Sequence, residues 1–315
     1  MKQFRALGGL AALALLALTA CGGSSNPVAT ESASAAASGA SSGASGSGAG
    51  ALTIGSANFQ ENVLLAEIYA SALQAKGVTV TKKLNIGSRE TYIPGLKDGS
   101  IDLIPEYSGV LLQYFDKGAT AVTSAEVYTA LAKAVPANLT VLEQSKAEDK
   151  DAIVVSSQTA AKYKLTSIAD LAPVAKDLVL GGPPEFKTRV DGVPGLASKY
   201  GVTFKEFKAL DAGGPLTINA LKSGQVQAAD IFTTDPSIVV NGFVVLQDPK
   251  SLYTAQNVLP LINKAKVTPA ITAALNGVSA KLDTKTLTDL VAQVVTDKKE
   301  PADVASAWLK TNGLA

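Results

Sequence analysis

The chain has 315 residues, with 28 Lys and Arg against 27 Asp and Glu. This even balance argues against the long-range attraction on which nucleic-acid and acidic-polymer partners depend. Hydrophobic residues make up 47% and aromatic residues only 5%, a composition that suits an aliphatic globular core and makes each well-placed aromatic informative.

The first twenty residues have the pattern of a secretory signal. Lys2 and Arg5 form a basic start, residues 7–18 are an apolar run, and the sequence LTAC ending at Cys21 resembles the lipobox of bacterial lipoproteins. A membrane-spanning helix is the alternative, but this run is shorter than the roughly 20 apolar residues that cross a bilayer. We therefore expect a lipoprotein signal peptide over residues 1–20.

Cys21 is the only cysteine in the chain, so an intrachain disulfide and a two-cysteine metal site are both excluded. Its position after the apolar run predicts lipidation. Residues 21–50 are almost entirely Ser, Ala and Gly, a composition typical of a flexible tether. We expect a folded body that begins near Ala51 and is lipid-anchored on the extracytoplasmic face of the cell membrane.

A weak internal repeat is present in the body. The sequence GVTV at 77–80 recurs as GVTF at 201–204, and LKDGSI at 96–101 recurs as LKSGQV at 221–226. The copies are much further apart than a solenoid period of about 20 to 50 residues. We interpret the repeat as one supersecondary unit used twice, once in each of two lobes.

Strands and helices alternate within each copy. The first copy has an apolar strand at 52–56, a helix that ends at Gly77, a second helix from Ser88 to Gly99, and a strand that follows it. The second copy has a strand at 178–182 and a helix between Pro215 and Gly224. This alternation predicts an α/β fold with mostly parallel sheets, in which ligands bind beyond the carboxyl ends of the strands.

Polar and aromatic side chains stand at several of these strand ends. When the repeats are superimposed, Tyr107 and Ser108 coincide with Phe232 and Thr233. We expect these pairs to face each other across a cleft between the lobes, although each aromatic could instead pack under a loop. Ser56, the last residue of the first strand, and Asn58, which follows that strand, are further candidates.

Arg189 follows the strand at 178–182 and could grip a ligand carboxylate with two hydrogen bonds. The alternative for Arg189 is a solvated salt bridge.

Catalysis is not indicated. The chain contains no histidine, which removes the commonest general base and metal ligand. The G-x-S-x-G match at 39–43 lies in the tether, and the acidic residues at 148–151 lack EF-hand spacing. We predict no metal site and no cofactor. An enzyme using only the carboxylates of Glu106 and Glu185 remains an alternative.

Several motifs in the body together resemble one known family. From Leu52 to Ala315 the chain resembles the substrate-binding proteins of osmoprotectant ABC importers, which bind glycine betaine, carnitine or choline. The motifs that carry the resemblance are IGSANFQE at 54–61, GSID at 99–102, PEYSG at 105–109, EFKTRVDG at 185–192 and FTTD at 232–235.

The resemblance implies a two-lobed periplasmic-binding-protein fold of type II with two chain crossings. Lobe 1 would comprise 51–153 and 244–315, and lobe 2 would comprise 154–243, with hinges near 151–155 and 242–247. The protein would be a monomer without enzymatic activity that delivers its ligand to ABC permease subunits.

In that family a cage of tyrosines holds a quaternary ammonium by cation–π attraction. Tyr107 matches one cage tyrosine, but Asp151 and Ile218 stand where relatives have others. Phe59, Phe186 or Phe232 could replace them, or Asp151 could pair with a cation. The resemblance also implies that Arg189 binds a carboxylate.

We therefore expect a small zwitterion or quaternary amine of the osmoprotectant class, while an amino acid, another amine or an apolar compound remains an alternative. The expected ligand-binding residues are Ser56, Asn58, Phe59, Tyr107, Ser108, Asp151, Arg189, Phe232 and Thr233.

Overall fold

The structure, a computed structural model, describes residues 51–315. The predicted signal peptide, the lipidation site at Cys21 and the tether lie outside the described residues. Within residues 51–315, no helix has the length and apolar character needed to span a membrane.

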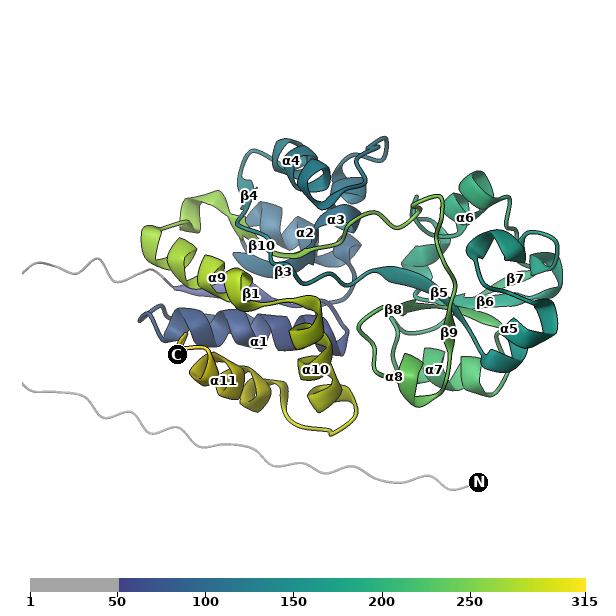
Figure 1. Cartoon of the computed structure of the whole chain (residues 1–315). Coiled ribbons are helices and arrows are strands. Elements are labelled where there is room, and N and C mark those ends of the chain that lie inside the picture. The colour runs from purple at the N-terminus through teal and green to yellow at the C-terminus, as the bar shows by residue number, and fades with distance from the viewer. Residues whose placement is uncertain (1–50) are drawn as a thin grey trace, which may run out of the picture. The chain divides into compact units, whose positions relative to one another are not determined.

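Two five-stranded mixed sheets form the framework (Figure 1). The first has the order β2-β1-β3-β10-β4 and the second the order β7-β6-β8-β5-β9. In each sheet four strands run in one direction, and the fourth strand in the order, β10 or β5, is antiparallel to both of its neighbours. The strands are β1 (Leu52–Gly55), β2 (Val80–Lys83), β3 (Leu103–Tyr107), β4 (Leu139–Val141), β5 (Asp151–Val155), β6 (Val179–Gly182), β7 (Glu206–Ala209), β8 (Ala228–Phe232), β9 (Val244–Val245) and β10 (Val258–Asn263).

The two sheets have equivalent topology, which confirms that one unit is used twice. β1, β2 and β3 occupy the same places in the first sheet as β6, β7 and β8 in the second. The repeated glycines also have equivalent roles, since Gly99 and Gly224 both follow a helix with positive φ values of 82° and 73°.

Helices cover both faces of each sheet (Figure 1). We call the first sheet with α1–α4 and α9–α11 the first lobe, and the second sheet with α5–α8 the second lobe. The α-helices are α1 (Gln60–Gln74), α2 (Arg89–Asp98), α3 (Ser108–Phe115), α4 (Ser124–Ala134), α5 (Ser157–Tyr163), α6 (Val193–Tyr200), α7 (Pro215–Lys222), α8 (Ser237–Val240), α9 (Pro269–Lys281), α10 (Thr284–Val295) and α11 (Pro301–Thr311). Short 3-10 helices lie at Ile168–Leu171, Ala175–Asp177, Pro184–Lys187 and Lys264–Lys266.

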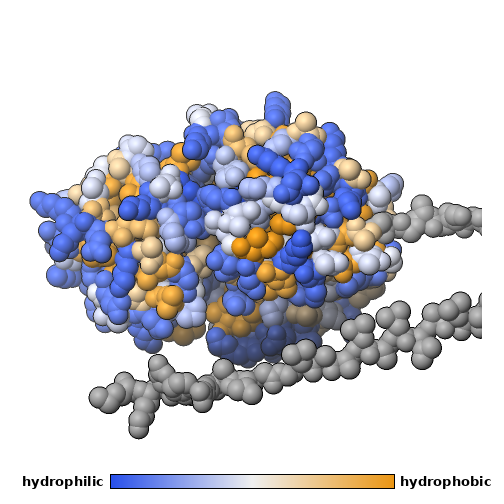
Figure 2. All heavy atoms as spheres, turned by 180° about the vertical axis from the view of Figure 1, so that it is seen from behind, coloured by the Kyte–Doolittle hydropathy of each residue, from blue (hydrophilic) through white to orange (hydrophobic). Residues whose placement is uncertain are grey.

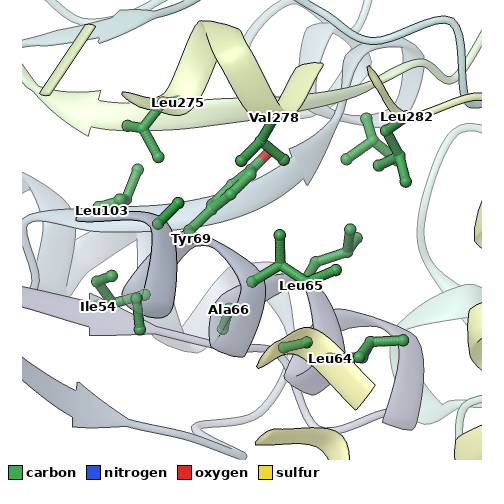
Figure 3. Close-up of a cluster of buried hydrophobic side chains, with 14 of the residues drawn as sticks. Ile54, Leu64, Leu65, Ala66, Tyr69, Leu103, Leu275, Val278 and Leu282 are labelled. Carbon is green, nitrogen blue, oxygen red and sulfur yellow. The ribbon is translucent and has the colours of Figure 1, made fainter. Parts of the chain in front are cut away.

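The core of the first lobe is built around α1. Leu64, Leu65 and Tyr69 of this helix are almost completely buried, and Figure 3 shows Tyr69 extending toward Val278 of α9. Because α1 packs against the sheet on one side and α9 and α11 on the other, it is apolar around most of its circumference. This packing fixes the N-terminal end of α1, which reaches the site.

The chain crosses between the lobes a few residues from where the resemblance placed the boundaries. β5 and β9 both pair within the second sheet, so the expected boundaries at 153/154 and 243/244 cut through that sheet. Tyr253 belongs to the second-lobe core. The two crossing segments are residues 148–150 and 254–257, which run antiparallel and are joined by the Glu148–Asn257 bridge and by the hydrogen bond from Asp149 N to Gln256 O. The segments expected as hinges are therefore regular strands.

Hydrophilic residues cover most of the face seen in Figure 2, and hydrophobic residues appear there in small separate groups. A mainly hydrophilic face of this kind is typical of a protein surface exposed to solvent.

Candidate ligand-binding site

A small cavity lies between the two lobes. Its volume is about 50 Å³, far below the roughly 300–1,000 Å³ of pockets for drug-sized ligands. The residues that line it come from both lobes and are Ala57, Asn58, Phe59, Ser88, Arg89, Tyr92, Tyr107, Val110, Asp149, Asp151, Pro183, Glu185, Arg189, Ala212, Phe232 and Gln256. Of the nine ligand-binding residues expected from the sequence, the structure brings together six: Asn58, Phe59, Tyr107, Asp151, Arg189 and Phe232.

A wider hollow of about 720 Å³ lies over α4, but its lining residues all belong to the first lobe. Residues of the sequence motifs do not reach it, so the interlobe cavity is the stronger candidate.

Three aromatic rings meet at the cavity. Phe59, which precedes α1, lies with its ring centroid 4.8 Å from that of Phe232 at the end of β8, and 6.0 Å from that of Tyr107 at the end of β3. The expectation that the two strand-end aromatics share a cleft therefore agrees with their positions. Phe186 does not take part, because it is buried in the second-lobe core beside Phe207. Ile218 packs in the second lobe away from the cavity.

Tyr107 is held by a carboxylate that sequence reasoning missed. Its hydroxyl donates to Glu61 Oε1 at 2.8 Å, and Thr234 of the second lobe donates to Glu61 Oε2. Burial raises the pKa of Glu61, while the hydrogen bonds from Thr234 and Tyr107 act to lower it. Glu61 is part of the IGSANFQE motif, so its place at the start of α1 was the available signal.

Three expected hydroxyl residues do not line the cavity. Ser56 is fully buried; its hydroxyl donates to Ala57 O and accepts from Asn85 N. Ser108 donates to Ala255 O and accepts from Asn257 N, which ties β3 to the returning crossing segment. Thr233 donates to Asp149 and accepts from Lys150 N. These three hydroxyls form hydrogen bonds with backbone groups and with the carboxylate of Asp149. Their contribution is therefore to hold the walls of the cavity in place.

Two arginines line the cavity and each is paired with a protein carboxylate. Arg89 Nε and Nη2 donate to both oxygens of Glu106 at 2.8 Å, and Tyr92 donates to the same carboxylate. Arg89 and Glu106 are both buried, which makes this pair costly to break from one side. Glu106, considered above as a catalytic carboxylate, is thus committed to an ion pair.

Arg189 reaches across the cavity to the first lobe. Its Nε and Nη2 donate to Glu90 Oε1 and Oε2 at 3.0 and 2.9 Å, and Glu185 lies 3.8 Å away. Partial burial acts to raise the pKa of Glu90, but the hydrogen bond and charge of Arg189 lower it to about 2. The guanidinium of Arg189, which we expected to bind a ligand carboxylate, is therefore paired with the carboxylate of Glu90 from the first lobe.

Acidic side chains outnumber the basic ones around the cavity. Asp149 is buried where the chain first crosses, and burial together with the charge of Glu61 raises its pKa. Asp151 is half-buried and lines the cavity, with Gln256 Nε2 donating to it at 3.3 Å. An aromatic and acidic cavity of this kind can bind a small organic cation by cation–π and charge attraction.

Comparisons with known proteins give a consistent result. A family model described as the substrate binding domain of ABC-type glycine betaine transport systems, OpuAC, matches residues 50–311. The glycine betaine-binding protein YehZ of Escherichia coli K12 is 27% identical over 279 residues, which are 84% of this chain and 92% of that protein. The ergothioneine transport permease and binding protein EgtU of Helicobacter pylori G27 is 25% identical, over 84% of this chain and 48% of that protein.

Solved structures agree with the fold. A structure described as a glycine betaine/carnitine/choline ABC transporter matches with a TM-score of 0.66 and 23% identity, over 84% of this chain and 99% of that chain. Apo YehZ of Escherichia coli matches with a TM-score of 0.58 and 27% identity, again over 84% of this chain and 99% of that chain.

Proposed function

Because the chain belongs to the family of substrate-binding domains of ABC-type glycine betaine transport systems, we propose that it captures a small cationic or zwitterionic solute of the osmoprotectant class between its lobes. The solute is carried unchanged to permease subunits in the membrane. The observation that carries the proposal is the convergence of Phe59 and Tyr107 of the first lobe with Phe232 of the second around one cavity.

The aromatic walls suit a methylated cation, because a desolvated ring attracts a cation by on the order of 2 kcal/mol. Relatives described as binding glycine betaine and carnitine support this ligand class. The cavity of about 50 Å³ is smaller than such a ligand, so the lobes separate to admit it and close again around it. The crossing segments at 148–150 and 254–257 are where that motion occurs.

The proposal includes the location and the anchor. The body works outside the cytoplasm beside its permease, as a monomer held to the membrane by a lipid on Cys21. Three other roles compete: binding of an amino acid or other amine, binding of an apolar compound, and hydrolysis by carboxylates. The ion pair that engages Glu106 and the absence of histidine from the sequence weigh against hydrolysis.

Thermal unfolding with a ligand panel tests the proposal. The panel is glycine betaine, choline, carnitine, proline betaine and amino acids. A solute that binds only the folded state stabilises it by about 2.7 kcal/mol at a hundredfold excess over its Kd, which raises the unfolding midpoint. A rise with a methylated or other organic cation that Tyr107→Ala abolishes supports the proposal. A rise that Tyr107→Ala leaves intact places binding outside the cavity and contradicts it.

A further inference from the structure

Three carboxylates of the second lobe lie near one another, and one of them, Asp151, lines the cavity. Asp151 begins β5, Asp230 lies on β8, and Asp191 precedes α6. The β5–β8 register pairs Asp151 with Phe232 and Ile153 with Asp230. Since facing residues and those two apart share one face of a sheet, Asp151 and Asp230 project to the same side. Asp191 and Asp230 are only 4% and 1% exposed, whereas Asp151 reaches the cavity wall.

A buried hydroxyl lies against the same carboxylates. Tyr253 is 6% exposed, and its hydroxyl has no hydrogen-bond partner among residues 51–315. Its ring and Asp151 line one groove beside the crossing segments. Burial and then the charges of Asp230, Asp151 and Asp191 raise the pKa of Tyr253.

The hydrogen-bond donors near these acidic groups do not satisfy all of their oxygens, although Gln256 Nε2 donates to Asp151. Asp230 Oδ1 is buried without a partner among the described residues, although buried polar atoms are nearly always paired. None of the ion pairs formed within residues 51–315 includes Asp151, Asp191 or Asp230. Burial and mutual repulsion consequently raise the pKa of Asp191 and Asp230.

The two arginines that line the cavity already form ion pairs with glutamates of the first lobe. Arg89 pairs with Glu106, and Arg189 pairs with Glu90. The charges of Arg89 and Arg189 act on Asp191 from a distance, but no direct ion pair within residues 51–315 competes with a bound cation for the three carboxylates. The unpartnered acceptor on Asp230 favours a cation that carries N–H groups.

Quaternary ammonium groups do not satisfy this acceptor, because they have no N–H to donate, and they are best held by several aromatic rings. Ammonium and guanidinium groups donate several charge-assisted hydrogen bonds to carboxylates. We propose that Asp151, Asp191, Asp230 and the hydroxyl of Tyr253 form an acidic subsite that selects a ligand with a primary ammonium or guanidinium group over its fully methylated counterpart. This inference rests on the proposed function, since it deepens the same interlobe site.

The test compares matched cations by calorimetry on the full chain. The probes are ethanolamine against choline, and butylammonium and butylguanidinium against butyltrimethylammonium. We expect each N–H donor to bind about tenfold or more tightly than its methylated partner, because a charged hydrogen bond contributes enough for a tenfold change. Asp151→Asn, Asp191→Asn and Tyr253→Phe should each reduce this preference. Asp289→Asn on α10, an exposed position, removes the same charge and should leave it unchanged.

The outcomes separate the subsite from the proposed function. If methylated probes bind more tightly, or if the three variants retain the wild-type preference, the subsite is refuted while carriage of an organic cation stands. If N–H probes bind with the expected preference but Tyr107→Ala has no effect, the subsite is supported and the shared cavity is refuted. Binding of no organic probe, or binding of Ca²⁺ or Mg²⁺ alone through the three aspartates, refutes the subsite. The thermal-unfolding panel of betaines and amino acids then decides separately whether the proposed function stands.

Discussion

Replacing Asp191 with Asn should stabilise the ligand-free protein at neutral pH. Burial, followed by the charge of Asp151, raises the pKa of Asp191 from 3.8 to about 6, although Arg189 and Arg89 partly offset this effect. The folded protein therefore holds this proton more tightly than the unfolded chain does. By linkage, stability falls as the pH rises from about 4 to about 6, and the loss is complete above that range.

The magnitude follows from the two pKa values. A difference of about two pKa units corresponds to about 3 kcal/mol of unfolding free energy. Asp151 and Asp230 repel the same charge and titrate together with Asp191, so 3 kcal/mol is an upper value. Because Asn cannot ionise, Asp191→Asn escapes this penalty. We expect a gain of roughly 1–3 kcal/mol at pH 7.5 and almost none at pH 4.

Urea unfolding at pH 4, 5, 6, 7 and 8 provides the measurement. Wild type, Asp191→Asn and the charge control Asp289→Asn are followed under the same conditions. The difference between Asp191→Asn and wild type should grow between pH 4 and 6 and then remain constant. A variant that is destabilised by the same amount at every pH would refute the reasoning, because Asp191 would then stabilise the fold by packing or hydrogen bonding.

Three further outcomes follow from the site. Tyr107→Ala should weaken binding of the cognate cation at least about tenfold by calorimetry, since the loss of one cage ring exceeds 1.4 kcal/mol. Glu106→Gln should destabilise the protein by about 3–5 kcal/mol in urea unfolding, because Arg89 is left buried without its counter-ion. Arg189→Gln should cost only about 1 kcal/mol, because the Glu90 side chain is 45% exposed and water screens the pair, yet increase the radius of gyration measured by X-ray scattering.

Each of these three predictions has a control variant or a result that would contradict it. Tyr107→Phe keeps the ring and should retain more affinity than Tyr107→Ala, so equal losses would assign the effect to the hydroxyl bond with Glu61. A double variant with Arg89→Met and Glu106→Met should recover most of the stability lost in Glu106→Gln. An unchanged radius for Arg189→Gln would show that the aromatic contact of Phe59 and Phe232 is enough to hold the lobes together.

Much of the fold could be predicted from the sequence because it depends on local patterns. The repeated GVTV and LKDGSI segments fix the same helix ends and strands in both lobes, so the equivalence of the sheets was predictable. The points where the chain crosses between the lobes were not predictable. Asp151–Val155 has the composition of any buried strand, so its sequence does not tell which of the two sheets it joins. Its assignment to the second sheet depends on pairing with β8, a contact between residues about 80 positions apart.

The site was predicted less completely than the fold, because the partners of its polar groups depend on tertiary contacts. Strand-end position predicted that Tyr107 and Phe232 lie at the interlobe cavity, and both residues line it; their role in ligand binding stays a prediction. A hydroxyl has more choices, and Ser56 and Ser108 bond to backbone groups that the sequence does not reveal. The acidic groups Asp191 and Asp230 were missed because their importance depends on burial without a partner, which is a property of the folded surroundings.

The place of β10 in the first sheet has a consequence for synthesis. β10 lies between β3 and β4, yet it follows the whole second lobe in the chain. As residues appear from the N-terminus onward, β5 to β9 are all present by Val245, so the second lobe can complete its sheet while the first lacks a central strand. Until β10 and the helices α9 and α11 arrive, α1 has no cover on its outer side, and this exposed apolar helix is where a chaperone would bind. The half of the protein that is made first is therefore the last to be finished.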